Sequence, residues 1–165
     1  MKKLTYLLLL STFVSFAQTE KKSTVKFSAK IENRNGDTLT IYGANRFKQV
    51  IPINKKGVFE ATFETTDGLH QFSDGNESSM MYLKNGDDLS MTMDTKQFDE
   101  SISYKGKGAE ENNFMAKKAL KDEQFELTAF DKEKEEFSAL FDKKKKADLA
   151  SLENGKFNDG FKKEI

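Results

Sequence analysis

Short runs in which apolar and polar side chains alternate fill the chain from residue 25 to residue 105. Alternation with a period of two is typical of β-strands that are buried on one face only. The apolar positions of the first run are Val25, Phe27, Ala29 and Ile31. This run ends near Asn35-Gly36-Asp37, where Asn and Gly tolerate the left-handed backbone of a tight turn. Further runs occupy residues 38–42, 47–53, 58–63, 69–73, 80–83, 89–94 and 102–104.

The spacing of these runs predicts the class of the β-domain. About eight strands, roughly 8 to 12 residues apart and without a helical period between them, are typical of an antiparallel β-sandwich or a barrel-like domain. Parallel pairing would need crossover helices, which this stretch lacks. Pro52 cannot donate a hydrogen bond to a neighbouring strand, so we expect its strand at a sheet edge or at a bulge. Residues 35–42 and 85–94 both begin with Asn-Gly-Asp, which we interpret as shared turn chemistry and not as an internal repeat.

The pattern changes to a helical period after Gly108. Residues 109–154 contain no Pro or Gly, and most residues from 131 to 148 are charged. Apolar side chains recur in two helical stripes, namely Ala116, Ala119, Leu120, Leu127 and Phe130, then Phe137, Leu140, Phe141, Leu149 and Leu152. The sequence therefore predicts an α+β protein in which a charged helical hairpin, turning near Asp131, follows the β-domain. The pattern indicates no element against which the last residues, 155–165, would pack, so we expect them to begin a further segment.

The first 17 residues have the composition of a secretory signal peptide. Two lysines precede an apolar run from Leu4 to Phe16, and small residues stand where a signal peptidase needs them. We expect cleavage between Ala17 and Gln18, which places the mature protein in the periplasm or cell envelope. A membrane span is the competing interpretation, but the run is shorter than the roughly 20 apolar residues that a bilayer requires. After cleavage the sequence predicts no membrane span.

The overall charge and the absence of cysteine exclude several classes of function. Lys and Arg number 27, as do Asp and Glu, and loss of Lys2 and Lys3 would leave a net charge of about −2. No basic stripe offers neutralisation of phosphates, so nucleic acid is not an expected partner. Without Cys the chain has no disulfide, no redox thiol and no site for lipid attachment to an N-terminal cysteine.

The segment Gly106-Lys107-Gly108 precedes the first predicted helix, as phosphate-binding loops do. A dinucleotide-binding loop would need a third glycine where Glu111 stands, and a Walker loop would need Ser or Thr in place of Gly108. Glu110 and Glu111 also fall in the first helical turn, where they complement the positive end of the helix. We therefore interpret Gly106 and Gly108 as the junction between strand and helix, and not as a ligand cradle.

No combination of residues in the chain predicts a catalytic centre, a cofactor site or a metal centre. His70 is the single histidine and is expected to be a surface or half-buried strand residue. No Gly-x-Ser-x-Gly segment presents a nucleophile, and nitrogen–sulfur metal sites cannot be built without Cys.

Two groups of residues have an alternative functional interpretation. The acidic residues in or beside turns are Asp67, Asp74, Asp87, Asp88 and Asp94. We expect them to accept hydrogen bonds from their own backbone, with a weak calcium loop left open as the alternative. The methionines of neighbouring runs are Met80, Met81, Met91 and Met93. They are expected to fill the core, and a hydrophobic ligand pocket or partner groove is the alternative.

Several segments together resemble a known family. They are FSAKIENRNGDTLTIYG, IPINKKGVFEATF and YLKNGDDLSMTMDTKQFDESISYKGKGAEENNF, followed by the charged helical stretch. In this combination the chain resembles the N-terminal region of bacterial cell-envelope thiol-disulfide oxidoreductases of the TlpA/ResA-like kind. The resemblance implies that the β-domain passes into helices at residues 106–113 and that a thioredoxin-fold domain with Trp-Cys-x-x-Cys follows. The catalytic cysteine pair of that family corresponds to no residue here.

The resemblance and the residue patterns together predict a domain organisation and a role. We expect a signal peptide at residues 1–17, an antiparallel β-domain at 18–107 and a helical connector at 108–165 that stops short of a further domain. The chain itself is predicted to be a non-catalytic accessory module without a cofactor. Its expected partners are the thioredoxin-fold domain of the same parent protein and that domain's protein substrates. The alternative is an independent exported β-sandwich protein that binds a small apolar ligand or a glycan.

Overall fold

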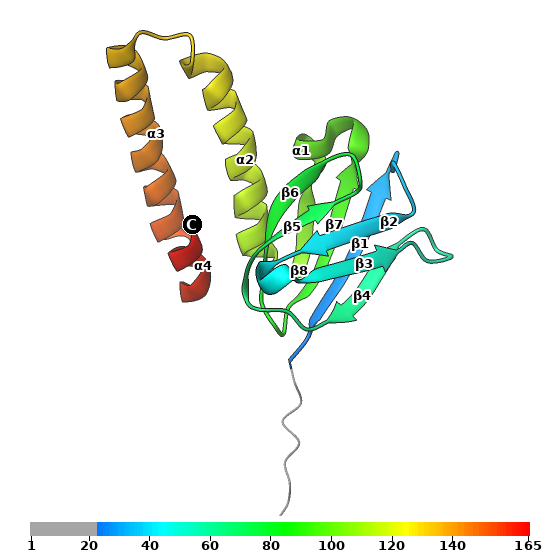
Figure 1. Cartoon of the computed structure of the whole chain (residues 1–165). Coiled ribbons are helices and arrows are strands. Elements are labelled where there is room, and N and C mark those ends of the chain that lie inside the picture. Colours follow the sequence, from blue (N-terminus) through cyan, green and yellow to red (C-terminus); the bar gives the residue numbers. More distant parts are fainter. Residues whose placement is uncertain (1–22) are drawn as a thin grey trace, which may run out of the picture.

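Two four-stranded β-sheets form the body of the protein, and a long helical hairpin rises beside them (Figure 1). The computed structural model describes residues 23–165. The predicted cleavage between Ala17 and Gln18 therefore lies outside the described residues. The architecture confirms the predicted α+β class, a sandwich-like β-domain followed by helices.

The strands follow the predicted runs. They are β1 (Val25–Glu32), β2 (Thr38–Tyr42), β3 (Lys48–Pro52), β4 (Phe59–Phe63), β5 (Gly68–Ser73), β6 (Ser78–Leu83), β7 (Asp88–Asp94) and β8 (Ser103–Lys107). One sheet has the order β4-β1-β7-β8 and the other has the order β3-β2-β5-β6. Pro52 ends β3, which lies at the edge of its sheet as predicted, because a missing N–H costs no inter-strand hydrogen bond there.

One strand pair departs from the predicted antiparallel pattern. β1 and β7 run parallel, with Phe27 opposite Leu89 and Ile31 opposite Met93. A parallel pair does need a long connection, but here the intervening strands β2 to β6 supply it in place of a helix. Parallel pairing was therefore possible for this pair, although the stretch contains no crossover helix.

The alternating apolar side chains of both sheets meet in one core. Its fully buried members include Leu39, Ile41, Ile51, Phe59, Phe72, Leu83 and Leu89. Met81 and Met91 are also fully buried and Met93 nearly so, as expected of core-filling residues, whereas Met80 is exposed. Large side chains thus occupy the space between the sheets. This favours core filling over the alternative interpretation, a ligand pocket at the methionines.

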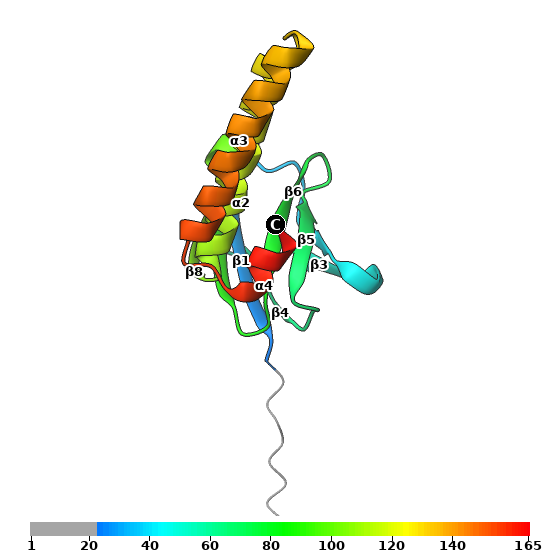
Figure 2. The same cartoon turned by 90° about the vertical axis from the view of Figure 1, so that its left-hand side faces the viewer.

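The helices begin after β8. α2 (Ala109–Ala129) and α3 (Lys134–Asn154) form the predicted hairpin, and Asp131 lies in the turn between them. Three short segments complete the chain before β8, namely η1 (Ala44–Arg46), η2 (Thr95–Gln97) and α1 (Phe98–Ser101). The hairpin projects well beyond the sandwich in both views (Figures 1 and 2).

Two asparagines attach the base of α2 to one edge strand of each sheet. Asn112 Oδ1 accepts from the backbone N–H of Tyr82 at 2.9 Å, and its Nδ2 donates to the Tyr82 carbonyl at 2.8 Å. Asn113 makes the same pair of bonds with Tyr104, each at 2.9 Å. Because Tyr82 lies on β6 and Tyr104 on β8, α2 bridges the edges of both sheets. These four hydrogen bonds fix the direction in which the hairpin leaves the sandwich.

The last residues have a partner, contrary to the prediction. α4 (Asp159–Glu164) turns back against the sandwich, where Phe161 is fully buried and its ring lies 5.1 Å from that of Tyr82 (Figure 2). Asn158 caps α4 and donates from Nδ2 to Glu111 Oε1 at 2.8 Å. Phe157 also packs here, with its ring 4.8 Å from that of Phe114. The pattern missed this packing because two aromatic side chains, and no periodic stripe, carry it.

Candidate functional site: an aromatic groove between the long helices

The two glycines predicted to form the junction lie where β8 passes into α2. Gly106 and Gly108 have φ angles of 92° and 96°, a left-handed conformation that side chains disfavour. A Cβ atom at Gly106 would collide with the Asp88 carbonyl oxygen, and one at Gly108 would lie 2.8 Å from Asp87 Oδ2. The corner is therefore closed by protein atoms of the preceding strand and its turn, which leaves no cradle for a phosphate.

His70 is buried, which corrects the prediction of a surface or half-buried residue. It is 2% exposed because it lies on the inward face of β5 together with Phe72. Its Nδ1 lies 2.9 Å from the Gly68 carbonyl and its Nε2 lies 2.7 Å from Thr65 Oγ1. Burial lowers the pKa of His70 below its ordinary value, against the opposing effects of the Gly68 carbonyl and the charge of Asp67. A neutral ring that donates to Gly68 and accepts from Thr65 has both nitrogens satisfied, so His70 has a structural role.

Three of the five aspartates beside turns, Asp74, Asp87 and Asp94, accept hydrogen bonds from the backbone of their own turns, as predicted. In the described part of the chain the other two do not, because Asp67 accepts from the distant Asn85 N–H and Asp88 pairs with Lys26. Asp74 Oδ1 accepts from the N–H groups of Asn76 and Glu77, both at 2.9 Å. Burial opposes ionisation of Asp74, but these bonds and one from Asn35 outweigh it and hold its pKa below the ordinary value. Asp87 and Asp94 likewise accept backbone N–H groups of their own turns. Within residues 23–165, no three His, Cys, Asp or Glu side chains converge as metal ligands would.

A hollow lined mainly by apolar side chains lies between α2 and α3. Five phenylalanines line it, namely Phe114, Phe125, Phe130, Phe137 and Phe141, and we call it the aromatic groove. It has a volume of about 520 Å³ and continues along Leu149 and Leu152 to Ile165. The rings of Phe125 and Phe137 lie 6.1 Å apart, and those of Phe130 and Phe137 lie 6.2 Å apart. These separations are those of rings in contact, so the two helices meet through their aromatic side chains near the tip.

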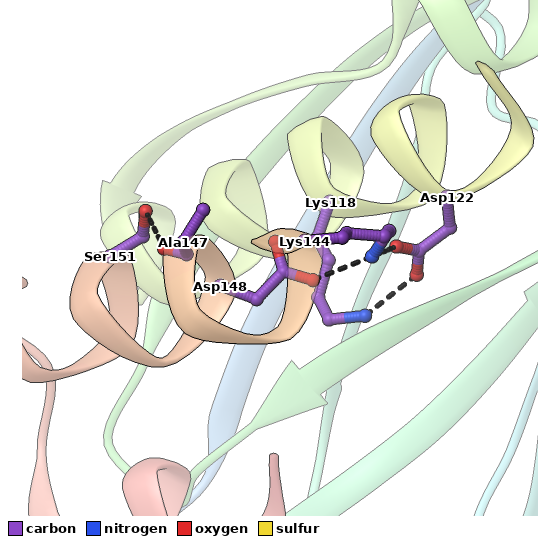
Figure 3. A network of polar contacts seen from close by, with 6 residues as sticks. All are labelled: Lys118, Asp122, Lys144, Ala147, Asp148 and Ser151. Carbon is purple, nitrogen blue, oxygen red and sulfur yellow. Dashed lines mark hydrogen bonds and ion pairs between the residues drawn. The ribbon is translucent and has the colours of Figure 1, made fainter. Parts of the chain in front are cut away.

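A cluster of charged side chains holds the two helices together lower down (Figure 3). Lys144 of α3 pairs with Asp122 of α2 and, at 2.5 Å, with Asp148 of its own helix. Lys118 pairs with Asp122 from the other side at 2.6 Å. Burial opposes ionisation of both Asp122 and Lys144, but their mutual hydrogen bonds and charges outweigh it. The pKa of Asp122 is therefore lowered and that of Lys144 raised, so this pair is ionised at neutral pH.

Much of the apolar surface of the hairpin is uncovered. Leu127 is 76% exposed and Phe130 is 68% exposed, and Phe141 and Leu149 are about half exposed. All of the 21 described residues of α3 are at least partly exposed to solvent. Contiguous exposed apolar side chains rimmed by charges are typical of surfaces that bind another molecule.

The sequence pattern identified part of this groove. The predicted stripes contain Phe130, Phe137 and Phe141, which the structure brings together. They omit Phe114 and Phe125, although these two side chains are eleven residues apart and therefore share a helical face. The sequence pattern also does not show that the two helices leave much of these apolar stripes exposed to solvent.

Comparisons with known proteins do not identify a family. No protein-family model matches the chain, and a search of curated proteins finds no match. One similar solved structure is the crystal structure of a DUF3823 family protein from Parabacteroides merdae ATCC 43184, with 13% sequence identity and a TM-score of 0.30. The similarity covers 52% of this chain and 47% of that one, so the chain spans about half the length of that structure. A likeness at this level supports no conclusion about function. Within residues 23–165, no helix is both long enough and apolar enough to cross a bilayer.

Proposed function

We propose that this chain is a non-catalytic protein-docking module that serves as an accessory part of an exported thiol-disulfide oxidoreductase. The observation that carries the docking role is the aromatic groove, whose apolar side chains project from the sandwich on a hairpin and remain exposed. A rigid scaffold that presents an uncovered apolar surface is the usual arrangement of a binding module. The whole sequence lacks Cys, so the chain cannot attack a disulfide itself.

The shape of the groove favours a protein over a small molecule. Sites for small molecules usually enclose most of the ligand surface. Here Phe130 stands largely in solvent, Phe141 and Leu149 are about half exposed, and the groove runs along two helices to Ile165. An amphipathic helix fits such a surface because it can cover a long apolar stripe. A small apolar ligand is the second candidate, since about 520 Å³ lies within the range of small-molecule sites.

The link to an oxidoreductase rests on the family resemblance. Its most distinctive segment is GKGAEENN, and the structure gives several of these residues a definite task. Gly106 and Gly108 make the corner, Glu111 accepts from Asn158, and Asn112 and Asn113 attach α2 to the two sheets. These roles support the interpretation of the segment as a connection between a β-domain and a helical arm.

The coding sequence downstream of Ile165 tests the parent protein. We expect it to encode a thioredoxin-fold domain with Trp-Cys-x-x-Cys, in which a helix N-terminus lowers the pKa of the first thiol. An intact locus with a stop codon directly after Ile165 and no such domain would leave the independent binding protein as the better proposal.

Activity of the parent protein tests the docking role. Phe130→Ser should lower kcat/KM for a protein disulfide by about tenfold, a loss of about 1.4 kcal/mol, and leave reduction of a small disulfide unchanged. Val50→Ser is the matched control, because Val50 is an exposed apolar residue on β3, outside the groove. Equal effects of the two substitutions, or an equal loss with the small disulfide, would contradict docking through the groove.

A further inference from the structure

The hairpin has the geometry of one half of a four-helix bundle. Its two helices are antiparallel neighbours joined by a short turn, and their shared apolar face is open on one side. Four-helix bundles bury such faces by packing two helical pairs against each other. The hairpin projects beyond the sandwich, and the 21 residues of α2 span about 30 Å, which is enough for several turns of packing (Figure 1).

The charges along the hairpin are segregated by height. The acidic tip, residues 122–142, contains eight Asp or Glu and two Lys, a net charge of −6. The basic collar below it, residues 117–121 and 143–149, contains seven Lys and one Asp, a net charge of +6. Neither the apolar stripes nor the ion-pair cluster requires this separation of charge. The separation does affect how favourably another molecule can bind along the groove.

This separation favours one arrangement of two hairpins. If two hairpins packed side by side in the same direction, their acidic tips would face each other, and so would their basic collars. In opposite directions, each tip of charge −6 lies beside a collar of charge +6, so attraction adds to the apolar contact. A two-fold axis across the groove generates this arrangement from identical chains.

We propose that the aromatic groove is filled by the hairpin of a second copy of this chain, packed antiparallel to form a four-helix bundle. This inference rests on the proposed protein-docking role of the groove and names a second copy as the protein that docks there. An effect of Phe130→Ser on a protein disulfide would then act through loss of the dimer. The dimer would set two parent molecules in a fixed two-fold relation, with both sandwiches at opposite ends of the bundle.

Two groove residues report directly on the arrangement. Glu126 of the tip and Lys145 of the collar both line the groove and are exposed. Within residues 23–165, neither side chain has an ion-pair partner. In the antiparallel pair, Glu126 of each copy lies beside the collar that carries Lys145 of the other.

Sedimentation of the purified chain and of charge variants tests the proposal. We expect a dimer whose dissociation constant rises with salt. Glu126→Lys and Lys145→Glu should each raise that constant by about tenfold or more, because like charges then meet at two symmetric positions. An equimolar mixture of the two variants should form heterodimers, and one chain carrying both substitutions should dimerise again. Glu123→Lys, a tip substitution outside the groove lining, is the matched control, because it changes the tip charge equally but should raise the constant less than Glu126→Lys does.

Disulfide trapping tests the direction of packing, because the chain has no cysteine of its own. A mixture of Glu126→Cys and Lys145→Cys should give the mixed disulfide in preference to either homodisulfide. Preference for homodisulfides of Glu126→Cys would indicate parallel packing and overturn the proposal. So would a chain that stays monomeric at high concentration, or a dimer unaffected by Glu126→Lys. These measurements need no oxidoreductase activity. If the chain dimerises but no thioredoxin domain is encoded downstream, only the proposed link to an oxidoreductase is refuted, and the dimer proposal stands.

Discussion

The sandwich and the hairpin use apolar side chains in opposite ways. In the sandwich, Phe59, Phe72 and Leu89 are essentially removed from solvent. In the hairpin, Phe130 and Phe141 lie on a helix pair in which Ala129 is the buried apolar residue. The same residue types therefore stabilise the fold in one region and remain available for contact in the other. Stability is expected to be concentrated in the sandwich and the base of α2, with the hairpin tip opening more easily.

The largest expected effect separates the two regions by their phenylalanines. Phe72→Ala should lower the free energy of unfolding by about 3 to 5 kcal/mol, because it empties a fully buried site. Phe130→Ala should lower it by only about 0.5 kcal/mol in dilute solution, because that ring is mostly exposed. Urea unfolding of both variants measures the difference. Similar losses would show that the hairpin is as tightly integrated as the sandwich.

The next effect concerns the point where the two regions meet. Asn112→Ala should cost about 1 to 3 kcal/mol, because it leaves the buried N–H and carbonyl of Tyr82 without their partner. It also removes the hydrogen bond to the Gly108 carbonyl. Asn113→Ala breaks the equivalent pair at Tyr104 and should cost less, because Asn113 is less buried than Asn112. Hydrogen exchange should show the base of α2 opening in the Asn112 variant, and unchanged protection there would contradict the attachment.

The sandwich was largely predictable from the sequence because period-two alternation reports directly on burial in a sheet. The positions of its strands, the edge location of Pro52 and the hairpin turn near Asp131 all followed from local patterns. The parallel pairing of β1 and β7 did not, because register between distant strands depends on contacts that no local pattern encodes. The docking of Phe157 and Phe161 was missed for a similar reason, since two side chains are too few to give a periodic signal.

The candidate site was predictable only in part. The apolar stripes that line the groove were visible, but a stripe has the same pattern whether a neighbour covers it or solvent does. Burial of His70 could not be read from its polarity, because it depends on Thr65 and the Gly68 carbonyl both reaching the ring. The bridge formed by Asn112 and Asn113 was also hidden, since adjacent asparagines more often indicate a turn or a cap.

A pH dependence should distinguish the sandwich from the hairpin. The pKa of His70 is lowered in the folded protein, so the unfolded chain binds a proton more readily. The contribution of neutral His70 to stability is therefore complete above the ordinary pKa of 6.5 and declines as the pH falls below it. The midpoint temperature of thermal unfolding should decrease as the pH is lowered from about 8 to about 5. His70→Gln should make this pH dependence less steep. An unchanged slope in the variant would assign the dependence to other groups.

The smallest expected effect tests how the two helices of the hairpin are joined. Lys144→Met keeps the aliphatic stem near the Phe125 ring but removes the charge that Asp122 and Asp148 share. We expect a loss of about 0.5 to 1 kcal/mol, since ion pairs at partly exposed sites contribute little, and Asp122 keeps its bond to Lys118. Lys143→Met is the control, because Lys143 is exposed and outside the cluster. In about 1 M NaCl the difference between the two variants should shrink as the charges are screened. A difference that persisted in salt would mean that Lys144 joins the helices by packing and not by charge, which would make the hairpin more like the sandwich than its exposed surface indicates.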